Sequence, residues 1–468
     1  MHTPPRFQRA IVIGGSIAGL LSARALSNHF SQVILLERDP LPPGPEARKS
    51  VPQGRHVHAL LAAGRQVLET AFPGLVEELC AEGAESGDMG RDTAWFHCGA
   101  WKVRYVSDIR TVLCTRTFLE FKVRQRVAAL PNVLLRDGCS VEELLADGSR
   151  TLITGVRLKG PGGEETLEAD LVVDTSGRGS RGPRWLEALG YGQPEDQQIG
   201  IDLAYTSRLY EPPPDTVADW KVLIVYPRAP EAWRAGFISR VEGGRWIVSL
   251  SGYFGDHPPT DEPGFLEFAR SLSRPDIHEA LRGARPLTEP VTHKIPSSRW
   301  LHYERMERFP ENFILLGDAV CAFNPIYGQG MTVISMGMRR LDELLAAQGR
   351  ASPGSLQGFS RRFQRELAGL LEMPWLMSST MDLKYPQASG RRPPGQRLLQ
   401  WTFGTMIDLT SLDEQACRRF YEVMNMRHGA ESLLRPGFLK TFLSYGVKSF
   451  FVPLDQRANV STRPPPPA

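Results

Sequence analysis

The chain has 468 residues, and its formal net charge at pH 7 is only +3, from 55 Lys and Arg against 52 Asp and Glu. So small an excess excludes an electrostatic case for binding nucleic acid or an anionic membrane surface. Hydrophobic residues make up 41% and charged residues 23%, which excludes a disordered chain and indicates an ordinary globular protein with room for two or three domains.

The six cysteines lie far apart in the sequence and form no C-x-x-C pair. Neither a zinc ribbon nor a dithiol redox motif is expected, and no metal site is predicted. Scattered single cysteines are typical of buried thiols in a reducing compartment. The first residues, MHTPPRFQR, lack the apolar core of a signal peptide, and no apolar run reaches the length of a membrane span. We therefore expect a cytoplasmic protein.

The stretch from Ala10 to Leu26, AIVIGGSIAGLLSARAL, has the pattern of a buried strand, a tight turn of small residues and a helix. A second apolar run, Val33–Leu36, follows and ends in Glu37. In such a unit the glycines let backbone N–H groups approach a pyrophosphate, and the acid accepts hydrogen bonds from a ribose. Ser16 replaces the second glycine of the usual G-x-G-x-x-G pattern, but it is small. The sequence thus predicts an adenine dinucleotide site.

Two further segments carry polar residues near expected ligand edges. The run TRTFLEFKVRQRVAAL has helical spacing, with Thr115 or Thr117 as its cap and Arg116 at its start. Glu120 completes a capping box for Thr117. The run Asp170–Arg181, DLVVDTSGRGSR, has the pattern of a buried strand followed by a second turn of small residues.

Residues 309–348 carry a second strong pattern. An apolar strand, Phe313–Leu316, ends in Gly317 and Asp318, and a glycine-rich loop then leads into a helix from about Met331. A strand-end aspartate and a helix N-terminus together form a second ligand edge, because the first turn of a helix has free N–H groups and partial positive charge.

These segments together resemble the flavoprotein monooxygenases of the p-hydroxybenzoate hydroxylase fold. Three features of that family recur in order: the first turn ending in Glu37-Arg38, the turn at 170–181, and Gly317-Asp318 followed by Pro325 and Gly328-Gln329-Gly330. The family's arginine at a helix start is matched by Arg116. The resemblance covers about residues 8–350. Within the family the chain looks most like the olefin epoxidases of polyether and prenyl pathways, relatives of squalene epoxidase, through the segments GRHVHALL, SGRGSRGPRWLEALGY, GDAVCAFNPIYGQGM and DLKYP.

The resemblance implies bound FAD. By position, the first turn would approach the pyrophosphate, Glu37 the adenosine ribose, and Arg116 and Asp318 the flavin side of the dinucleotide. The helix start at Gly328–Met331 would face the isoalloxazine ring, whose reduced form carries negative charge that a helix N-terminus stabilises. The cofactor-binding residues predicted in this way are Gly14, Gly15, Ser16, Ala18, Gly19, Glu37, Arg38, Arg116, Asp318, Pro325, Gly328, Gly330 and Met331.

The resemblance further implies a monooxygenase that inserts one oxygen atom from dioxygen into an apolar natural-product substrate. Epoxidation of an olefin, or hydroxylation, would proceed through a flavin C4a-hydroperoxide. Because the cofactor carries this chemistry, no catalytic residue is named, and four candidates stay unranked: His56, His58, Tyr253 and His293. The alternatives are a flavin-dependent reductase or halogenase on the same fold, and a non-catalytic lipid-binding or escort protein. The halogenase motif W-x-W-x-I-P is absent from the sequence.

One departure from the family concerns the electron donor. The family's middle motif usually reads G-A-D-G, and this chain has Asp174-Thr175-Ser176-Gly177, with Ser176 in place of the acid. Direct binding of NADPH or NADH is one alternative. A separate flavin reductase, or free reduced flavin, is the other.

The expected fold class is α/β: a Rossmann-like FAD-binding domain with a mostly antiparallel β substrate domain and a helical C-terminal region. Residues 1–190 are expected to form the first part of the FAD-binding domain, with a β-rich insertion near 91–114. Residues 191–298 follow as the substrate-binding sheet. Residues 299–350 complete the FAD-binding domain, and residues 351–468 form the helical region.

The C-terminal stretch Phe438–Phe451, FLKTFLSYGVKSFF, places four aromatic residues near one helical face. The favoured interpretation is a helix packed on the core. The alternative is a helix resting on a membrane surface, with Lys440 and Lys448 at its polar edge.

Overall fold

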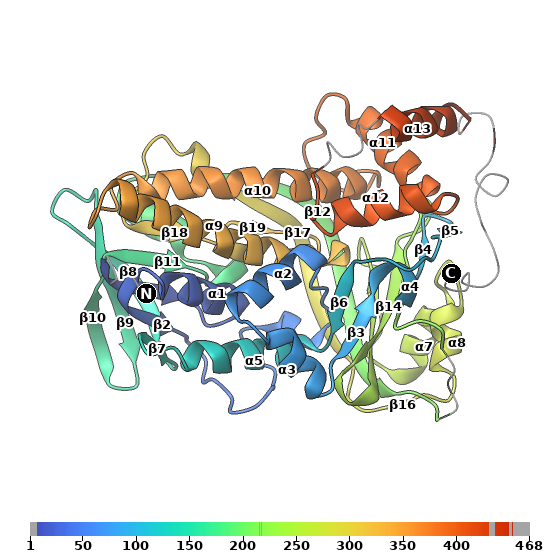
Figure 1. The fold of residues 1–468 in the computed structure, drawn as a ribbon, viewed down its shortest axis with the longest axis horizontal. Coiled ribbons are helices and arrows are strands. Elements are labelled where there is room, and N and C mark those ends of the chain that lie inside the picture. Colours follow the sequence, from blue (N-terminus) through green and yellow to red (C-terminus); the bar gives the residue numbers. More distant parts are fainter. Residues whose placement is uncertain (1–6, 215, 217, 430–435, 449–451, 453–468) are drawn as a thin grey trace.

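The computed structural model describes residues 7–214, 216, 218–429, 436–448 and 452, and only the backbone of 436–438 and 448. Figure 1 shows a parallel sheet on the left of the view and a larger, mostly antiparallel sheet on the right. Two long helices, α9 (Gly330–Ala351) and α10 (Phe359–Asp382), run side by side above the parallel sheet. The predicted α/β class, with a Rossmann-like part and a helical C-terminal region, is confirmed.

The parallel sheet carries the predicted nucleotide turn. Its apolar strands are buried on both faces, as parallel sheets require. Ile11, for example, lies between Ile34 and Val172, and none of the three is more than 4% exposed. The sheet order is β18 (Phe313–Leu315), β11 (Leu171–Asp174), β1 (Phe7–Ile13), β2 (Phe30–Leu36) and β7 (Val133–Arg136).

Helices and a small sheet surround the parallel sheet. Helix α1 (Ile17–Leu26) contacts both α9 and α5 (Arg116–Ala128), so the first turn and the later ligand edges belong to one packed unit. The remaining elements of this half are α2 (Ala62–Ala71), α3 (Leu75–Ala81), α6 (Gly182–Ala188), β8 (Ser140–Ala146), β9 (Ile153–Gly160) and β10 (Gly163–Glu168).

The larger sheet has nine strands, and all its neighbouring strands are antiparallel except β13 beside β4. One face packs on α7 (Glu262–Arg270) and α8 (Asp276–Leu281) through a separate apolar core, and the other face shares the main core with the parallel sheet. The order is β19 (Cys321–Ala322), β17 (Val291–His302), β12 (Glu195–Glu211), β15 (Arg245–Gly252), β14 (Arg234–Val241), β13 (Val222–Val225), β4 (Thr93–His97) and β5 (Ala100–Trp101), with β16 (Arg285–Pro286) beside β12.

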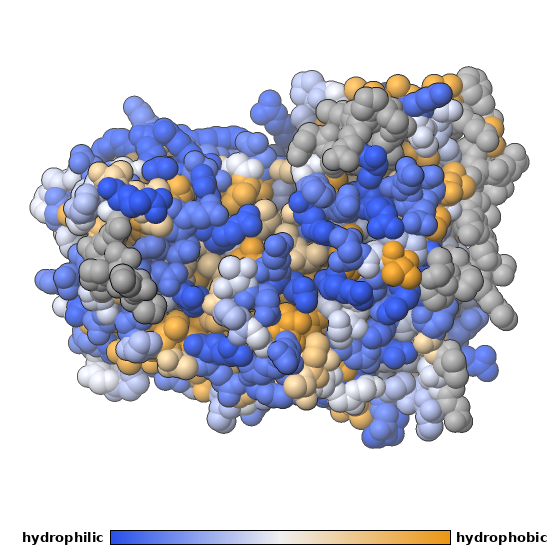
Figure 2. All heavy atoms as spheres, viewed as in Figure 1, coloured by the Kyte–Doolittle hydropathy of each residue, from blue (hydrophilic) through white to orange (hydrophobic). Residues whose placement is uncertain are grey.

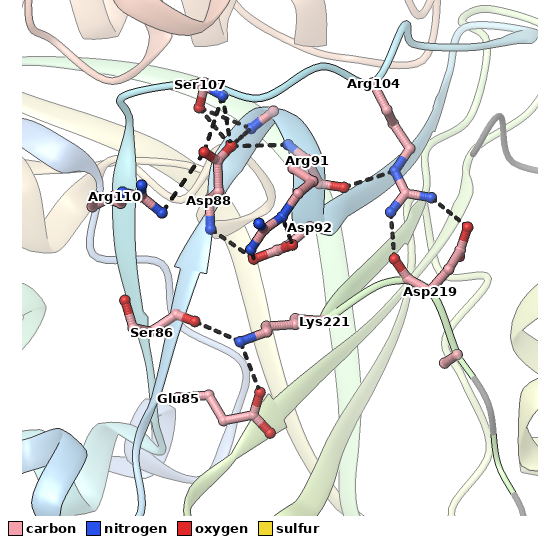
Figure 3. A network of polar contacts seen from close by, with 12 residues as sticks. Glu85, Ser86, Asp88, Arg91, Asp92, Arg104, Ser107, Arg110, Asp219 and Lys221 are labelled. Atoms are coloured by element: carbon pink, nitrogen blue, oxygen red, sulfur yellow. Dashed lines mark hydrogen bonds and ion pairs between the residues drawn. The ribbon is translucent and has the colours of Figure 1, made fainter. Parts of the chain in front are cut away.

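A polar network joins a two-stranded ribbon, β3 (Glu85–Asp88) and β6 (Arg110–Leu113), to the large sheet (Figure 3). Asp88 caps the short helix α4 (Met89–Asp92) and accepts a hydrogen bond from the Ser107 hydroxyl at 2.7 Å. Lys221, just before β13, donates to a carbonyl of β3 at 2.6 Å. Asp88 and Ser107 are buried, so their hydrogen bonds hold the ribbon in place, and the more exposed Lys221 links it to the sheet.

The C-terminal region adds α11 (Gln396–Leu409), α12 (Glu414–Met424) and α13 (Pro436–Lys448). Phe442 and Tyr445 of α13 pack in a small core with residues of α11, as the favoured interpretation expected. Leu439, Leu443 and Val447 lie exposed at a spacing of four, and Figure 2 shows hydrophobic atoms along the upper edge over α11 and α13. Phe450 and Phe451 lie outside the described residues. No helix within the described ranges is long and apolar enough to cross a membrane.

Candidate functional site

The carboxyl ends of β1, β2, β11 and β18 open into a cavity of about 380 Å³. This edge is where open α/β sheets bind ligands, and the volume is that of a small-molecule site. Tyr205, His293 and Ile295 of the large sheet form the facing wall. All predicted cofactor residues except Gly19 line this cavity: Gly14, Gly15, Ser16, Ala18, Glu37, Arg38, Arg116, Asp318, Pro325, Gly328, Gly330 and Met331.

Glycines shape the turn after β1. Gly14 has a φ of +102°, and a Cβ there would lie 2.9 Å from the Thr175 carbonyl oxygen. A Cβ on Gly19 would lie 1.7 Å from the carbonyl oxygen of Gly14. Gly19 therefore lets α1 pack closely under the turn, while its predicted contact with a pyrophosphate stays a prediction.

A buried ionic network lies behind this turn. Arg48 pairs with Glu37 at 2.8 Å and with Glu120 at 2.5 Å, and Arg116 pairs with Glu120 at 3.0 Å. Ser16 joins them, because its hydroxyl donates to Glu120 and accepts from Arg116, both at 2.9 Å. The network holds Glu37 at the tip of β2 and Arg116 at the cavity wall.

Burial and opposite charges compete in this network. Burial alone would lower the pKa of Arg48, but the negative charges of Glu120 and Glu37 raise it overall. Burial alone would raise the pKa of Glu120, but Arg116 and Arg48 lower it overall. Arg48 and Glu120 thus each favour the charged form of the other.

The predicted capping box at the start of α5 is wrong. Thr115, rather than Thr117, caps the helix by accepting a hydrogen bond from the Phe118 N–H at 3.3 Å. Glu120 cannot complete a box with Thr117, because its carboxylate is held by Arg116 and Arg48. The ionic partner from a distant loop overrides the local pattern.

Asp318 follows β18 and faces the cavity beside two arginines. Burial raises the pKa of Asp318, while Arg178 and Arg116 act in the opposite direction. Arg178 also lines the cavity, and it donates to the Ser297 carbonyl at 2.7 Å. Burial lowers the pKa of Arg178. The end of β18 therefore presents one carboxyl group within the electrostatic influence of two guanidinium groups, and groups of both signs are able to bind hydroxyl and phosphate oxygens.

The loop before α9 is fixed from both sides. The Asn324 side chain accepts from the Ile326 N–H at 3.1 Å, and Tyr226 of the large sheet's adjoining loop donates to the Ile326 carbonyl. Gly328 has a φ of +67°, which favours glycine. Apart from its chain neighbours and its own helix, no described atom lies within 4 Å of where a Cβ on Gly330 would be. The first turn of α9 has no side-chain cap and lines the cavity, so its N–H groups are available there.

The four unranked candidates fall in two places. His58 and His293 line the cavity, and His56 lies directly behind them, with its ring centre 6.1 Å from that of His293. Tyr253 lies elsewhere, in a cluster around the buried carboxyl group of Asp382.

In that cluster Asp382 accepts hydrogen bonds from Tyr327 at 2.8 Å, Asn324 at 2.9 Å and Tyr253 at 3.3 Å, all at one oxygen. Burial raises the pKa of Asp382 to about 7. Since Asn324 and Tyr327 belong to the loop before α9, this cluster supports the loop from the C-terminal side.

The structure shows how the turn is arranged at Ser176, which replaces the acid of the family's middle motif. The Ser176 hydroxyl lines the cavity wall but donates to Asp174 at 2.6 Å, and Asp174 is fully buried and also accepts from Ser180. Burial raises the pKa of Asp174. The acid of this turn therefore points into the protein, and the cavity has a hydroxyl where the family motif has a carboxylate.

Sequence reasoning missed several residues of the cavity and of the ionic network behind it. Arg48, in that network, stands in a loop rich in proline and glycine, where no periodic pattern singles it out. Arg178 lies inside the second turn, where its charge beside a strand end was a usable signal. Tyr205 lies on a strand whose facing side no sequence pattern fixed, whereas His293 was already one of the four unranked candidates.

The comparisons with solved structures show the fold. The flavin-dependent brominase Bmp2 has a TM-score of 0.65 and 13% identity, over 94% of this chain and 99% of that one. The p-nitrophenol 4-monooxygenase PnpA from Pseudomonas putida has a TM-score of 0.64 and 19% identity, over 90% and 99%. A flavoprotein/dehydrogenase from Cytophaga hutchinsonii also has a TM-score of 0.64, at 15% identity over 94% and 98%. The fold is that of the flavin-dependent monooxygenases and halogenases.

The sequence comparison shows the family. Protein Rv3254 of Mycobacterium tuberculosis is 33% identical over 427 residues, which are 88% of this chain and 89% of that protein. The chain belongs to the same family as this protein. No protein-family model matches the chain.

Proposed function

We propose that the chain binds FAD in the cavity of about 380 Å³ and is a flavin-dependent monooxygenase. The observation that carries the proposal is the convergence of separate segments on this one cavity. The turn after β1, the tip of β2, the start of α5 and the edge from β18 to α9 are distant in the sequence, and all of them line it. The shared fold of flavin-dependent enzymes supports the same cofactor.

The residues present fit FAD. Glu37, held by Arg48, would accept hydrogen bonds from the adenosine ribose, and the open N-terminus of α1 would receive the pyrophosphate. Asp318 and Arg116 would bind the chain that links the pyrophosphate to the flavin. The open N-terminus of α9 would face the flavin ring and stabilise negative charge there. When bound, FAD would supply the reaction with dioxygen and the transfer of oxygen.

The substrate we propose is apolar, and oxygen transfer to it is an epoxidation of an olefin or a hydroxylation. Ile295, Phe323 and Val57 give the cavity an apolar part next to the loop before α9. A substrate held there would exclude water from the flavin ring. NADPH or NADH is the proposed source of electrons, and a separate flavin reductase is the alternative that the turned-in carboxyl group of Asp174 supports.

Variants of Asp318 test the cofactor site. Asp318→Ala removes a carboxyl group from the cavity wall, and we expect FAD affinity to fall about tenfold or more. Asp318→Asn keeps the shape and the hydrogen-bonding capacity of the side chain, so its FAD affinity should fall less than that of Asp318→Ala. Asp196→Ala, at an exposed ion pair with Arg299, serves as the control. Equal FAD affinity in all three variants and the natural chain would contradict the proposed site.

Oxygen uptake tests the reaction class. The FAD-loaded protein is supplied with NADPH, NADH or reduced flavin, together with apolar olefins, and dioxygen consumption is measured with product analysis. Oxygen incorporated into the olefin supports a monooxygenase. Product formation that requires bromide or chloride would indicate a halogenase, and turnover without dioxygen would indicate a reductase.

A further inference from the structure

A second cavity, of about 510 Å³, lies where α10 passes the first residues of β12 and the last residues of β17. The 3₁₀ helix η4 (Tyr303–Arg305) and the segment that leads into α11 complete its walls. Figure 1 shows α10 extending from the parallel sheet toward the C-terminal helices. None of the described residues lines both this cavity, which we call the α10 cleft, and the FAD cavity. Its volume is that of a small-molecule site.

Part of the lining of the α10 cleft is aromatic and apolar. Trp300 of β17 and Trp375 of α10 meet edge to face, with ring centres 5.7 Å apart. Ile199, Ala368 and Leu383 also line the cleft, and all five side chains are buried in the protein on their other sides. Such a lining suits the apolar body of a ligand, and the two indole rings favour an aromatic one.

The lining also contains polar groups that lack partners. Gln396, the first residue of α11, is only 8% exposed. Neither its amide nitrogen nor its amide oxygen has a hydrogen-bond partner among the residues that the structure describes. The buried indole N–H of Trp300 is unpartnered in the same way. Because buried polar groups are normally paired, a partner that enters the cleft would stabilise this arrangement.

The charged side chains of the lining do not favour a charged ligand. Glu304 accepts a hydrogen bond from Nδ1 of His302 at 2.7 Å, and Arg305 pairs with Glu195 at 2.8 Å. The other charged side chains of the lining are exposed and carry both signs: Arg365, Glu372 and Arg391. A neutral ligand therefore fits the cleft best.

We propose that the α10 cleft binds a neutral, planar aromatic amide, such as a carboxamide or a lactam. The N–H of the ligand amide donates to the side-chain oxygen of Gln396, and its carbonyl oxygen accepts from the side-chain nitrogen. A glutamine amide forms such paired hydrogen bonds with a donor and an acceptor that lie next to each other. The aromatic ring packs against Trp300 and Trp375. This site is separate from the proposed FAD site and does not rest on it.

The test compares 2-naphthamide with methyl 2-naphthoate, which keeps the ring and the carbonyl group but lacks the N–H. Binding of each to the purified full chain is measured by calorimetry, once without FAD and once with saturating FAD. We expect 2-naphthamide to bind about five- to tenfold more tightly, the effect of one net hydrogen bond. Added FAD should leave both affinities unchanged. Since the measurement without FAD decides the inference, a chain that takes up no FAD would contradict the proposed function alone.

A substitution of Gln396 tests the role of its amide. Gln396→Leu removes the amide group at nearly unchanged volume, so the preference for 2-naphthamide should disappear. Gln415→Leu, at an exposed position of α12, is the matched control and should leave the preference unchanged.

A substitution of Gly369 on α10 tests the location of the ligand. Apart from its chain neighbours and the backbone of its own helix, no described atom lies within 4 Å of where a Cβ on Gly369 would be, so Gly369→Phe should fold. The new ring would fill the cleft, and binding of both ligands should be lost. Gly148→Phe, at an equally uncrowded glycine outside the cleft, is the control.

Five results would overturn the inference. These are equal binding of the two ligands by the natural chain, binding of neither, loss of binding when FAD is added, an unchanged preference in Gln396→Leu, and unchanged binding in Gly369→Phe.

Discussion

Arg48 is the single cation between two buried carboxylates, and Arg48→Ala tests how much the site depends on it. The Arg48 side chain is 4% exposed, and its partners Glu37 and Glu120 are 5% and 10% exposed. Removing it leaves Glu37 without its ion pair and Glu120 with Arg116 alone. Breaking a buried ion pair by removing one partner costs about 3–5 kcal/mol.

The expected loss of free energy of unfolding can be converted into a fall in melting temperature. At about 2.1 cal/mol/K per residue, the unfolding entropy of this chain is roughly 1 kcal/mol/K, so the melting temperature should fall by about 3–5 °C. The loss should shrink as the pH falls from 7 to 5. In the variant the pKa of Glu120 lies higher, because Arg48 no longer lowers it, and protonation then relieves the buried charge.

The assay is thermal unfolding of the variant and the natural chain at both pH values, with FAD titration on the same samples. Arg157→Ala is the control, because Arg157 pairs with Glu143 at 2.6 Å but the two side chains are 41% and 53% exposed. An exposed pair is worth at most about 1 kcal/mol. If Arg48→Ala destabilises the chain no more than Arg157→Ala does, then burial does not decide the strength of this network and the reasoning is refuted.

Further predictions concern Asp382, Gly19 and Asp88. Because the pKa of Asp382 in the folded chain is raised to about 7, the natural chain loses stability as the pH rises through that range, and Asp382→Asn should avoid about 3 kcal/mol of this loss between pH 5 and 8 in denaturant titrations; parallel curves would contradict it. Gly19→Ala should yield little folded protein by circular dichroism, whereas an alanine at Gly177, where no atom crowds a Cβ, should fold despite its positive φ. Asp88→Ala should lower the free energy of unfolding by about 2–4 kcal/mol, through the lost cap of α4 and the unpaired groups around Ser107; a loss under 1 kcal/mol would show that the network in Figure 3 is not stabilising.

Local patterns predicted the parts of the site that are continuous in the sequence. The turn after β1, Glu37 at the tip of β2 and Asp318 after β18 each lie at a strand end, and strand ends of a parallel sheet meet at one edge whatever the rest of the chain does. The fold class followed for the same reason, because buried strands alternating with helices allow few arrangements.

Partners that are distant in the sequence could not be predicted in this way. Arg48 binds Glu120, which lies 72 positions further along the chain, and no periodic pattern in the sequence relates the two residues. The error at Thr117 has the same origin, because a local capping box competes with an ion pair that only the tertiary structure supplies. Tyr205 faces the cavity after an irregularity in β12 between Gly200 and Leu203, and such an irregularity changes which side chains reach a face.

The most direct test of the account is the flavin content of the purified chain. The protein is denatured, and the released cofactor is identified by mass and quantified by absorbance; where the isolated protein is colourless, FAD is added and uptake is measured. We predict FAD at about one molecule per chain, or uptake to that level. A chain that carries no flavin and takes up none would contradict the central claim that the cavity at the carboxyl ends of β1, β2, β11 and β18 is an FAD site.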